Sequence, residues 1–314
     1  MIRFACAMVL SMLPVAAQTK GYTPPRTPDG QPDIQGIWSN AVLTPMERPA
    51  ELGAKAIFTA QEVAEYEKQV IDRNNKDRRD GPIVEDVGRA YNDFWWDRGT
   101  HIVKTRRTSL VTDADGKIPP MLPEAQKRNA DLREFRRLHP ADGPEDRPLM
   151  ERCIMLNSAG PPMVPSAYNN NYQVVQAPDY VTILNEMIHD VRVIPLDGRP
   201  HIPAQAQQYM GDSRGRWEGN TLVVDTTNFT PFTTFRGASE KMHLTERFTR
   251  TDAETLLYQF TVDDPATWAK PWSAEIPSLR VSGPLYEYAC HEGNQGMLGI
   301  LTGARAEGAE KGSK

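Results

Sequence analysis

The chain has 314 residues, of which 39% are hydrophobic and 25% charged, and it carries a formal net charge of −5. This composition predicts a globular protein with a sizeable core, and the acidic balance argues against nucleic acid or an anionic membrane surface as a partner. The 26 prolines predict stiff, extended loops, which suit a β-rich fold.

The first residues follow the pattern of a secretory signal peptide, residues 1–17. A charged start and an apolar run lead to small residues that predict cleavage near Ala17. The run is shorter than the roughly 20 apolar residues of a membrane-spanning helix, so no membrane span is expected. The mature protein is therefore expected to be periplasmic or extracellular.

Export changes how the cysteines are interpreted. Cys6 leaves with the signal peptide, so Cys153 and Cys290 remain in the mature chain. In an oxidising compartment these two are expected to form a disulfide that closes a long loop. Two buried thiols are the alternative.

Residues 18–171 are expected to wrap the rest of the fold with a short strand, two helices and long loops. The strand is predicted at 36–39, which contains the Gly-x-Trp triplet also found in the first strand of lipocalins. The two helices are predicted at about 60–77, after a Thr59–Glu62 capping box, and at 123–139, after a proline at the first helical position. Apolar residues at helical spacing mark their expected buried faces: Val63, Tyr66, Val70 and Ile71 in the first helix, and Leu132, Phe135 and Leu138 in the second.

Residues 172–302 are expected to form an antiparallel, lipocalin-like (calycin-like) β-barrel, which makes the protein mostly β. Short β-favouring segments are separated here by tight turns, and such a meander closes into a barrel or stacks as a sandwich. The predicted strands are 172–176, 180–186, 191–195, 216–218, 221–229, 243–250, 255–262 and 285–289. A further strand is predicted at 101–110, and a disordered tail at 303–314.

The clearest local signal is the hairpin around Gly219-Asn220, a pair typical of a type II′ turn. The strand after it alternates with a period of two, so Leu222 and Val224 face one side and Asp225 the other. Asp225 therefore lies either on a solvent-exposed outer face or in the wall of a cavity.

Four residues of the predicted strands are candidates for acid–base catalysis: His243, Asp225, Glu186 and Arg192. His243 could act as general acid or base, tuned by a carboxylate such as Asp225 or Glu186. Glu186 and Arg192 lie on consecutive strands, where a cross-strand ion pair is expected. The alternative is that these polar residues only hold the barrel together.

Two other patterns give weaker functional hypotheses. Residues 211–215 match the G-x-S-x-G pattern of serine hydrolases, but a hairpin follows instead of the required helix, so this activity is unlikely. Glu-x-x-His pairs end at His189 and His243, and on strands their members face opposite sides. A metal site gathered from His189, His243 and His291 stays an alternative; no metal and no cofactor are expected.

Aromatic and basic residues are the candidates for ligand binding: Trp38, Trp217, Arg247, Trp268 and Trp272. Trp268 and Trp272 lie in a proline-containing segment at the expected barrel mouth. They could stack on an aromatic or sugar-like ligand, or they could cap the core.

Four segments together resemble an uncharacterised family of secreted bacterial proteins. They are residues 32–38 (PDIQGIW), 211–229 (GDSRGRWEGNTLVVDTTNF), 243–248 and 263–265. The resemblance implies export and a lipocalin-like barrel. It also implies that the residues matching the family's motifs are functional candidates without assigned roles: Trp38, Arg192, Trp217, Asp225, His243, Glu246, Arg247 and Asp263.

Three functions fit these observations. The first is a small-molecule-binding protein that holds its ligand inside the barrel. The second is a cofactor-independent lyase, isomerase or hydratase that uses histidine and carboxylates in the same pocket. The third is a structural or interaction protein with a solid core. The sequence does not indicate an oligomeric state.

Overall fold

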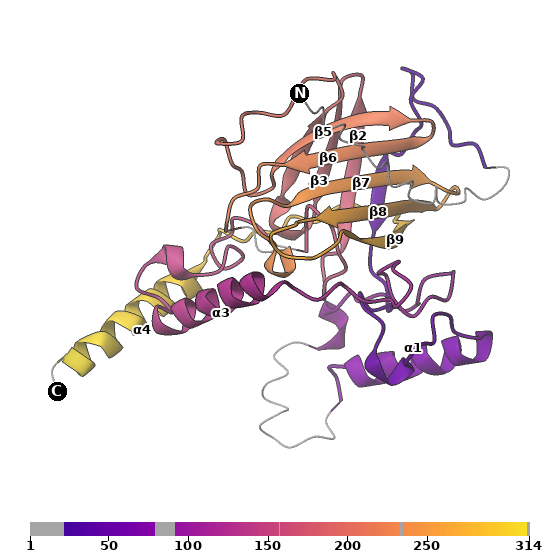
Figure 1. Ribbon diagram of the computed structural model, residues 1–314. Coiled ribbons are helices and arrows are strands. Elements are labelled where there is room, and N and C mark those ends of the chain that lie inside the picture. Colours follow the sequence, from indigo (N-terminus) through magenta and orange to yellow (C-terminus); the bar gives the residue numbers. More distant parts are fainter. Residues whose placement is uncertain (1–21, 79–91, 157, 233–234, 313–314) are drawn as a thin grey trace, which may run out of the picture.

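The computed structural model describes residues 22–78, 92–156, 158–232 and 235–312. The expected signal peptide and its cleavage near Ala17 lie outside these residues. One antiparallel sheet of nine strands curls into a nearly closed barrel, and the long helices lie outside it, toward one end (Figure 1). The protein is therefore mostly β.

The barrel is a meander in which strands adjacent in the chain are adjacent in space. The sheet order is β4-β3-β2-β1-β9-β8-β7-β6-β5. The strands are β1 (Gly36–Ser39), β2 (Asn171–Ala177), β3 (Tyr180–Asn185), β4 (Val191–Pro195), β5 (Asp212–Glu218), β6 (Thr221–Thr227), β7 (His243–Arg250), β8 (Thr255–Asp263) and β9 (Trp272–Arg280). The short β1 pairs with both β2 and β9 and so links the two halves of the sheet.

The remaining joint, between β4 and β5, has no hydrogen-bonded ladder within the described residues. Because every observed ladder is antiparallel, counting directions around the sheet leaves β4 and β5 running the same way. Parallel neighbours need a crossover rather than a hairpin, which explains the long connection at 196–211. A Cβ atom on Gly215 of β5 would lie 2.8 Å from Ile194 and 2.7 Å from Leu196, so this glycine permits the two strands to approach.

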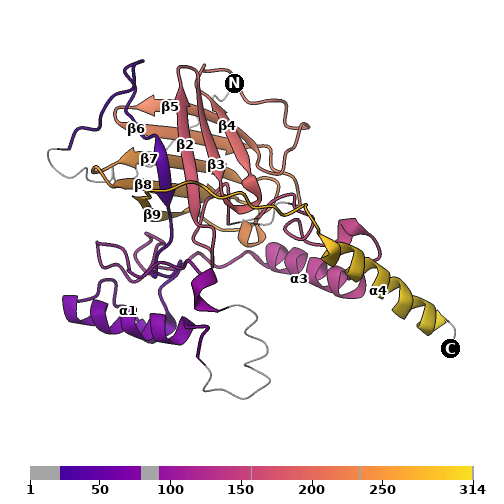
Figure 2. The same ribbon diagram turned by 180° about the vertical axis from the view of Figure 1, so that it is seen from behind.

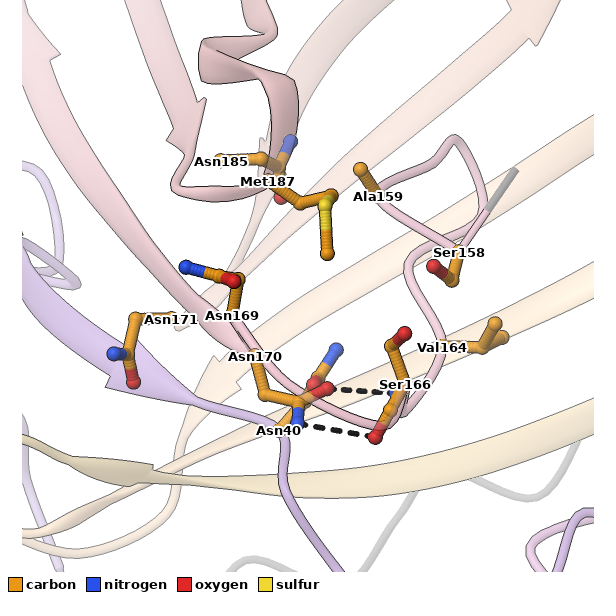
Figure 3. A pocket seen from close by; sticks show the side chains of 10 residues that line it. All are labelled: Asn40, Ser158, Ala159, Val164, Ser166, Asn169, Asn170, Asn171, Asn185 and Met187. Carbon is orange, nitrogen blue, oxygen red and sulfur yellow. Dashed lines mark hydrogen bonds between the residues drawn. The ribbon is translucent and has the colours of Figure 1, made fainter. Parts of the chain in front are cut away.

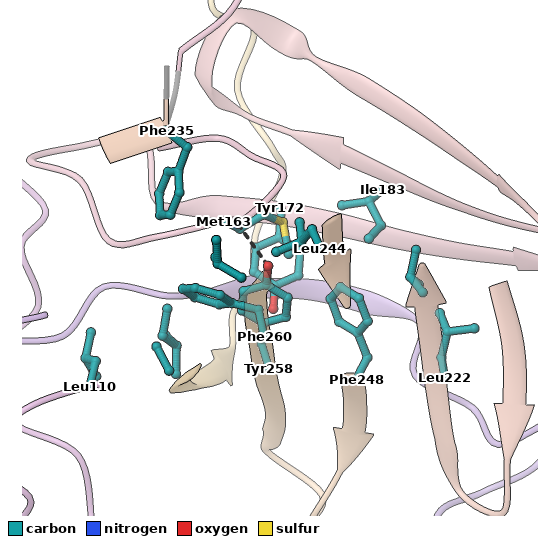
Figure 4. Packing of buried hydrophobic residues seen from close by; sticks show 14 of the residues in the cluster. Leu110, Met163, Tyr172, Ile183, Leu222, Phe235, Leu244, Phe248, Tyr258 and Phe260 are labelled. Atoms are coloured by element: carbon teal, nitrogen blue, oxygen red, sulfur yellow. Dashed lines mark hydrogen bonds between the residues drawn. The ribbon is translucent and has the colours of Figure 1, made fainter. Parts of the chain in front are cut away.

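The inside of the barrel is filled by side chains (Figure 4). Inner-face residues such as Leu222, Phe248 and Tyr258 are 0% exposed. A cavity wide enough for water would expose the side chains that line it, so these values mean close packing. The expected ligand site in the barrel interior therefore finds no space in this structure.

The hairpin prediction is confirmed. Gly219 has a positive φ of +62° and Asn220 does not, which identifies a type II′ turn. Glu218 pairs with Thr221 across it. Leu222 and Val224 face the core, and Asp225 lies on the outer face of the sheet.

Strand β9 was missed in the sequence because Pro277 interrupts its pattern. A proline removes a ladder donor and normally argues against a central strand. Here β1 meets β9 only at Leu279 and Arg280, and residues 110–112 contact it at Ser273, Ala274 and Glu275. Pro277 therefore lies between the two partners. The predicted strands at 285–289 and 101–110 are wrong, since neither segment forms a strand.

In the described residues, three long helices and five short 3₁₀ turns complete the fold. The helices are α1 (Ala60–Asn74), α3 (Pro123–Leu138) and α4 (Gln295–Gly312), and the 3₁₀ turns are η1 (Ala50–Leu52), η2 (Asp93–Trp95), η3 (Pro144–Asp146), η4 (Met187–His189) and η5 (Phe235–Gly237). Thr59 and Glu62 form a capping box at the start of α1, and Val70 packs into a small second core with Leu43, Phe58 and Ile102.

Two expectations about the helical parts are wrong. Phe135 and Leu138 of α3 are 52% and 57% exposed instead of buried, because α3 contacts the barrel through Arg128 and Asn129, which donate to the Gly237 carbonyl. The expected disordered tail is helical up to Gly312, since helix-favouring alanine, glutamate and lysine residues outnumber its glycines.

Cys153 and Cys290 lie at disulfide distance, with sulfur atoms 2.06 Å apart. Cys153 precedes β2 and Cys290 follows β9, so the bond ties the two ends of the main strand series together. The pairing expected from the sequence is present.

Candidate functional site

The segment after β9, residues 281–294, crosses the outer face of β1, β2 and β3 on its way to α4 (Figure 2). We name it the C-terminal strap. Its start is fixed by Val281 N–H, which donates to the Ile37 carbonyl at 2.9 Å. Its far part is fixed by the disulfide at Cys290 and by His189, whose Nδ1 donates to the Tyr288 carbonyl at 3.0 Å. Both ends of the strap are thus attached to the barrel.

A groove of about 470 Å³ lies between the strap and the sheet. Its floor is a single cross-strand row, because Ile37 pairs with Gln173 and Gln173 pairs with Leu184. Strap residues 284–287 form one wall, and Glu186 and His189 close one end. The volume and the mainly apolar floor with a few polar groups are those of small-molecule sites.

The apolar floor continues beyond the groove toward β4. Val191 pairs with Leu184, and Val193 and Val175 form the next row together with Thr182. These three valines are 47%, 53% and 46% exposed. Adjacent exposed valines on a sheet face are unusual for a surface without a binding role.

The corner that carries Glu186 has strained backbone. Ile188 and His189 have φ values of +58° and +51°, a region that a buried β-branched residue such as Ile188 rarely adopts. Next to them, burial raises the pKa of Asp190 to about 6, against the lowering effect of His189. Strain and a perturbed carboxyl group concentrate at functional sites, and here they border the groove.

Behind this corner lies a small polar pocket lined mainly by asparagine and serine (Figure 3). Asn170 organises it, since its side-chain oxygen accepts from Ser166 N–H at 2.7 Å and its amide donates to the Ser166 carbonyl at 3.1 Å. The pocket volume is about 10 Å³, the space of one water molecule, so no organic ligand fits. Asn171, which lines this pocket, donates a hydrogen bond to Glu186.

No protein-family model, curated protein or solved structure matches this chain. In the described residues, no helix is long and apolar enough to cross a membrane. In the same residues, no three His, Cys, Asp or Glu side chains are placed to hold a metal ion.

The predicted ion pair between Glu186 and Arg192 is wrong. Arg192 lies opposite Ile183 and faces the barrel interior, whereas Glu186 follows the outer face. Inside the barrel Arg192 binds Glu246 through two hydrogen bonds of 2.5 and 3.0 Å. Burial alone would lower the pKa of Arg192, but the Glu246 carboxylate outweighs it and raises the pKa. The guanidinium is therefore a buried structural cation.

The structure does bring His243 and Asp225 together, on the outer face of the sheet. His243 Nε2 lies 2.5 Å from one oxygen of Asp225, and His201 Nε2 lies 3.0 Å from the other. The second ring nitrogen of His201 lies 2.7 Å from Asp212.

This chain of side chains, Asp212–His201–Asp225–His243, holds the 196–211 connection onto the sheet. His201 was missed in the sequence because it lies in an irregular, proline-flanked loop, far along the chain from its partner Asp225. Burial would raise the pKa of Asp225, but the bonds from His243 and His201 outweigh it and lower the pKa. None of the pockets described in this structure is lined by Asp225 or His243.

The His243–Asp225 pair makes the stability of the fold depend on pH. The hydrogen bond that His243 donates to Asp225 raises the pKa of His243, against the effect of burial. A raised folded-state pKa adds stability that is fully present below the unfolded pKa of about 6.5 and is lost as the pH rises through the folded pKa. We expect His243→Gln to lower the free energy of unfolding at about pH 5.5 but not at about pH 9. The loss is at most about 1 kcal/mol, because the His243 side chain is 44% exposed.

Urea unfolding at both pH values checks this expectation. The control is His101→Gln, since His101 is 78% exposed and only 3.3 Å from Glu67. An equal loss for His243→Gln at both pH values would mean that the raised pKa of His243 does not stabilise the fold.

The predicted ligand-binding aromatics do not form a site. Trp38, Trp268 and Trp272 are at most 2% exposed, and Trp268 and Trp272 pack edge to face in the core. This is the core-capping alternative. Trp217 packs partly buried against the core, and Arg247 pairs on the outer face with Glu218 at 3.0 Å.

The serine of the G-x-S-x-G pattern is also structural. Ser213 lies within β5, is 5% exposed and shares a 3.0 Å hydrogen bond with Thr226. No helix follows it, so the geometry of a nucleophile elbow is missing. Gly211 has a φ of +65° and Gly215 faces β4, which accounts for both glycines of the pattern.

Proposed function

We propose that this protein is an exported small-molecule-binding protein on a lipocalin-like barrel, with its ligand in the groove under the C-terminal strap. The observation that carries the proposal is the groove of about 470 Å³ over the Ile37–Leu184 row. The proposed ligand lies outside the barrel, because the interior is filled with side chains.

The lipocalin-like part of the proposal is supported by the Gly-x-Trp triplet of β1. Gly36 leaves room for Arg280, whose guanidinium lies 4.8 Å from the ring of Trp38. A side chain on Gly36 would start 3.1 Å from that guanidinium. The triplet thus sets a cation–π contact at the junction of β1 and β9. The disulfide is consistent with an oxidising compartment outside the cytoplasm.

Binding of N-phenyl-1-naphthylamine, an apolar probe whose fluorescence rises in apolar sites, tests the groove. Leu184→Asp places a charge on the floor, and we expect it to weaken binding by about tenfold or more. The control is Leu279→Asp, which adds the same charge at an exposed leucine of β9 outside the groove. Equal affinities of wild type and Leu184→Asp would overturn the proposal.

A second candidate function is acid–base catalysis at His243, favoured by its 2.5 Å contact with Asp225. The raised pKa of His243 fits a general acid better than a general base. Loss of turnover in His243→Ala, with unchanged binding in a substrate screen, would support the enzyme. If the variant loses neither turnover nor binding, the role of His243 is to anchor the loop.

A further inference from the structure

In the part of the chain that the structure describes, Glu186 is a buried carboxylate without a basic partner. It is 4% exposed and accepts two hydrogen bonds, from Asn171 Nδ2 at 2.8 Å and from Tyr286 N–H at 3.3 Å. Both donors are neutral, and within the described part of the chain Glu186 forms no ion pair. A carboxylate offers about four acceptor positions, so part of its capacity is unused.

The other buried carboxylates are better satisfied. Asp264, which also forms no ion pair in the described residues, accepts four hydrogen bonds from Ser239, Ala266 and Thr267. Two others have charged partners. Glu246 binds the Arg192 guanidinium and the Tyr258 hydroxyl, and Asp212 binds Arg214 and His201. A buried charge is normally paired, because desolvation without compensation is unfavourable. Glu186 differs from these residues in one further respect, since it lines the groove.

The surroundings of Glu186 hold its carboxylate at the closed end of the groove. Asn171 and the strap backbone at Tyr286 each fix one carboxylate oxygen. The adjoining strained turn at Ile188 and His189 fixes the backbone behind it. The apolar row of Ile37 and Leu184 runs up to this point, and Leu285 faces it from the strap.

We propose that the groove binds an amphiphilic organic amine. The ammonium group donates hydrogen bonds to Glu186 and supplies its missing counter-charge, and the apolar body lies on Ile37 and Leu184 under Leu285. Glu287, on the exposed side of the groove, adds a second negative charge at the entrance. This inference rests on the proposed function and adds the chemical class of the ligand.

Three probes that share one ring system test the charge preference: 1-naphthylmethylamine, 1-naphthylmethanol and 1-naphthaleneacetate. At neutral pH the first is a cation, the second is neutral and the third is an anion. Calorimetric titration of the disulfide-intact protein is expected to give an affinity for the amine about tenfold or more above that for the alcohol, with the acetate weakest. Because the comparison uses the wild type, it does not depend on the folding of a variant.

Glu186→Gln keeps the shape and hydrogen-bonding reach of the side chain but removes its charge. We expect the variant to bind the amine and the alcohol with similar affinity, whereas Glu287→Gln, the matched control, keeps most of the preference. Equal affinities of the wild type for all three probes, or a preference that survives Glu186→Gln, would overturn the amine inference alone. If none of the probes binds and Leu184→Asp changes nothing for N-phenyl-1-naphthylamine, the proposed function falls as well.

Discussion

Replacing Glu246 with glutamine is expected to lower the free energy of unfolding by about 3–5 kcal/mol. The substitution keeps the shape of the side chain but leaves Arg192 as an uncompensated charge inside the barrel, where its side chain is 7% exposed. Glu246 also accepts from the Tyr258 hydroxyl at 2.8 Å, and that hydroxyl accepts from Met163 N–H at 3.0 Å. The carboxylate therefore holds together a connected polar group in an otherwise apolar core.

Chemical denaturation of the single and double variants measures this effect. Removing both charges with Arg192→Met and Glu246→Leu is expected to recover most of the loss, because well-packed apolar residues can replace a buried ion pair. Glu218→Gln is the matched control, since its pair with Arg247 is on the surface and is worth about 1 kcal/mol or less. A loss for Glu246→Gln no larger than that of the control would show that water reaches the Arg192–Glu246 pair.

The sequence predicts the faces of the strands well but not their partners across the barrel. Alternation along β6 puts Leu222 and Val224 on one face and Asp225 on the other, as observed, but it leaves open whether Asp225 faces solvent or lines a cavity. The partner of Arg192 is Glu246, 54 positions away. The sequence suggests Glu186 as the partner of Arg192 instead, because strands that follow each other in the chain usually pair as a hairpin. Pairs that span the barrel depend on its closure, which alternation alone does not specify.

The groove was the hardest feature to predict, because two irregular segments define it. Residues 285–289 alternate as a strand would, yet they form the strap because their end is held by the disulfide and not by a neighbouring strand. The sequence makes Glu186 a catalytic candidate because it lies on the face of a predicted strand. Its buried position beside the groove arises from the strained turn at Ile188, which has no sequence signature. Local sequence propensity does not predict features that depend on a distant cross-link or on a strained turn.

Replacing both Cys153 and Cys290 with serine is expected to lower the free energy of unfolding by about 2–5 kcal/mol. The two cysteines are 137 positions apart, and the chain-entropy model gives about 5 kcal/mol for a loop of that length. The measured loss is expected to fall below that value, because the strap lies outside the barrel ladders and gains freedom in the folded variant too. Urea unfolding of the oxidised protein, the reduced protein and the double variant measures it.

The same substitution separates the two roles of the disulfide. If the bond only restrains the unfolded chain, the double variant loses stability but binds N-phenyl-1-naphthylamine with unchanged affinity under native conditions. If it also holds the strap over the sheet, affinity falls together with stability, and reducing the wild type has the same effect. We expect the second result, because in the described residues the strap is joined to Glu186 and His189 by two hydrogen bonds, of 3.3 and 3.0 Å, and by a ring contact between His189 and His291. Unchanged affinity in the double variant would mean that these contacts alone keep the groove closed.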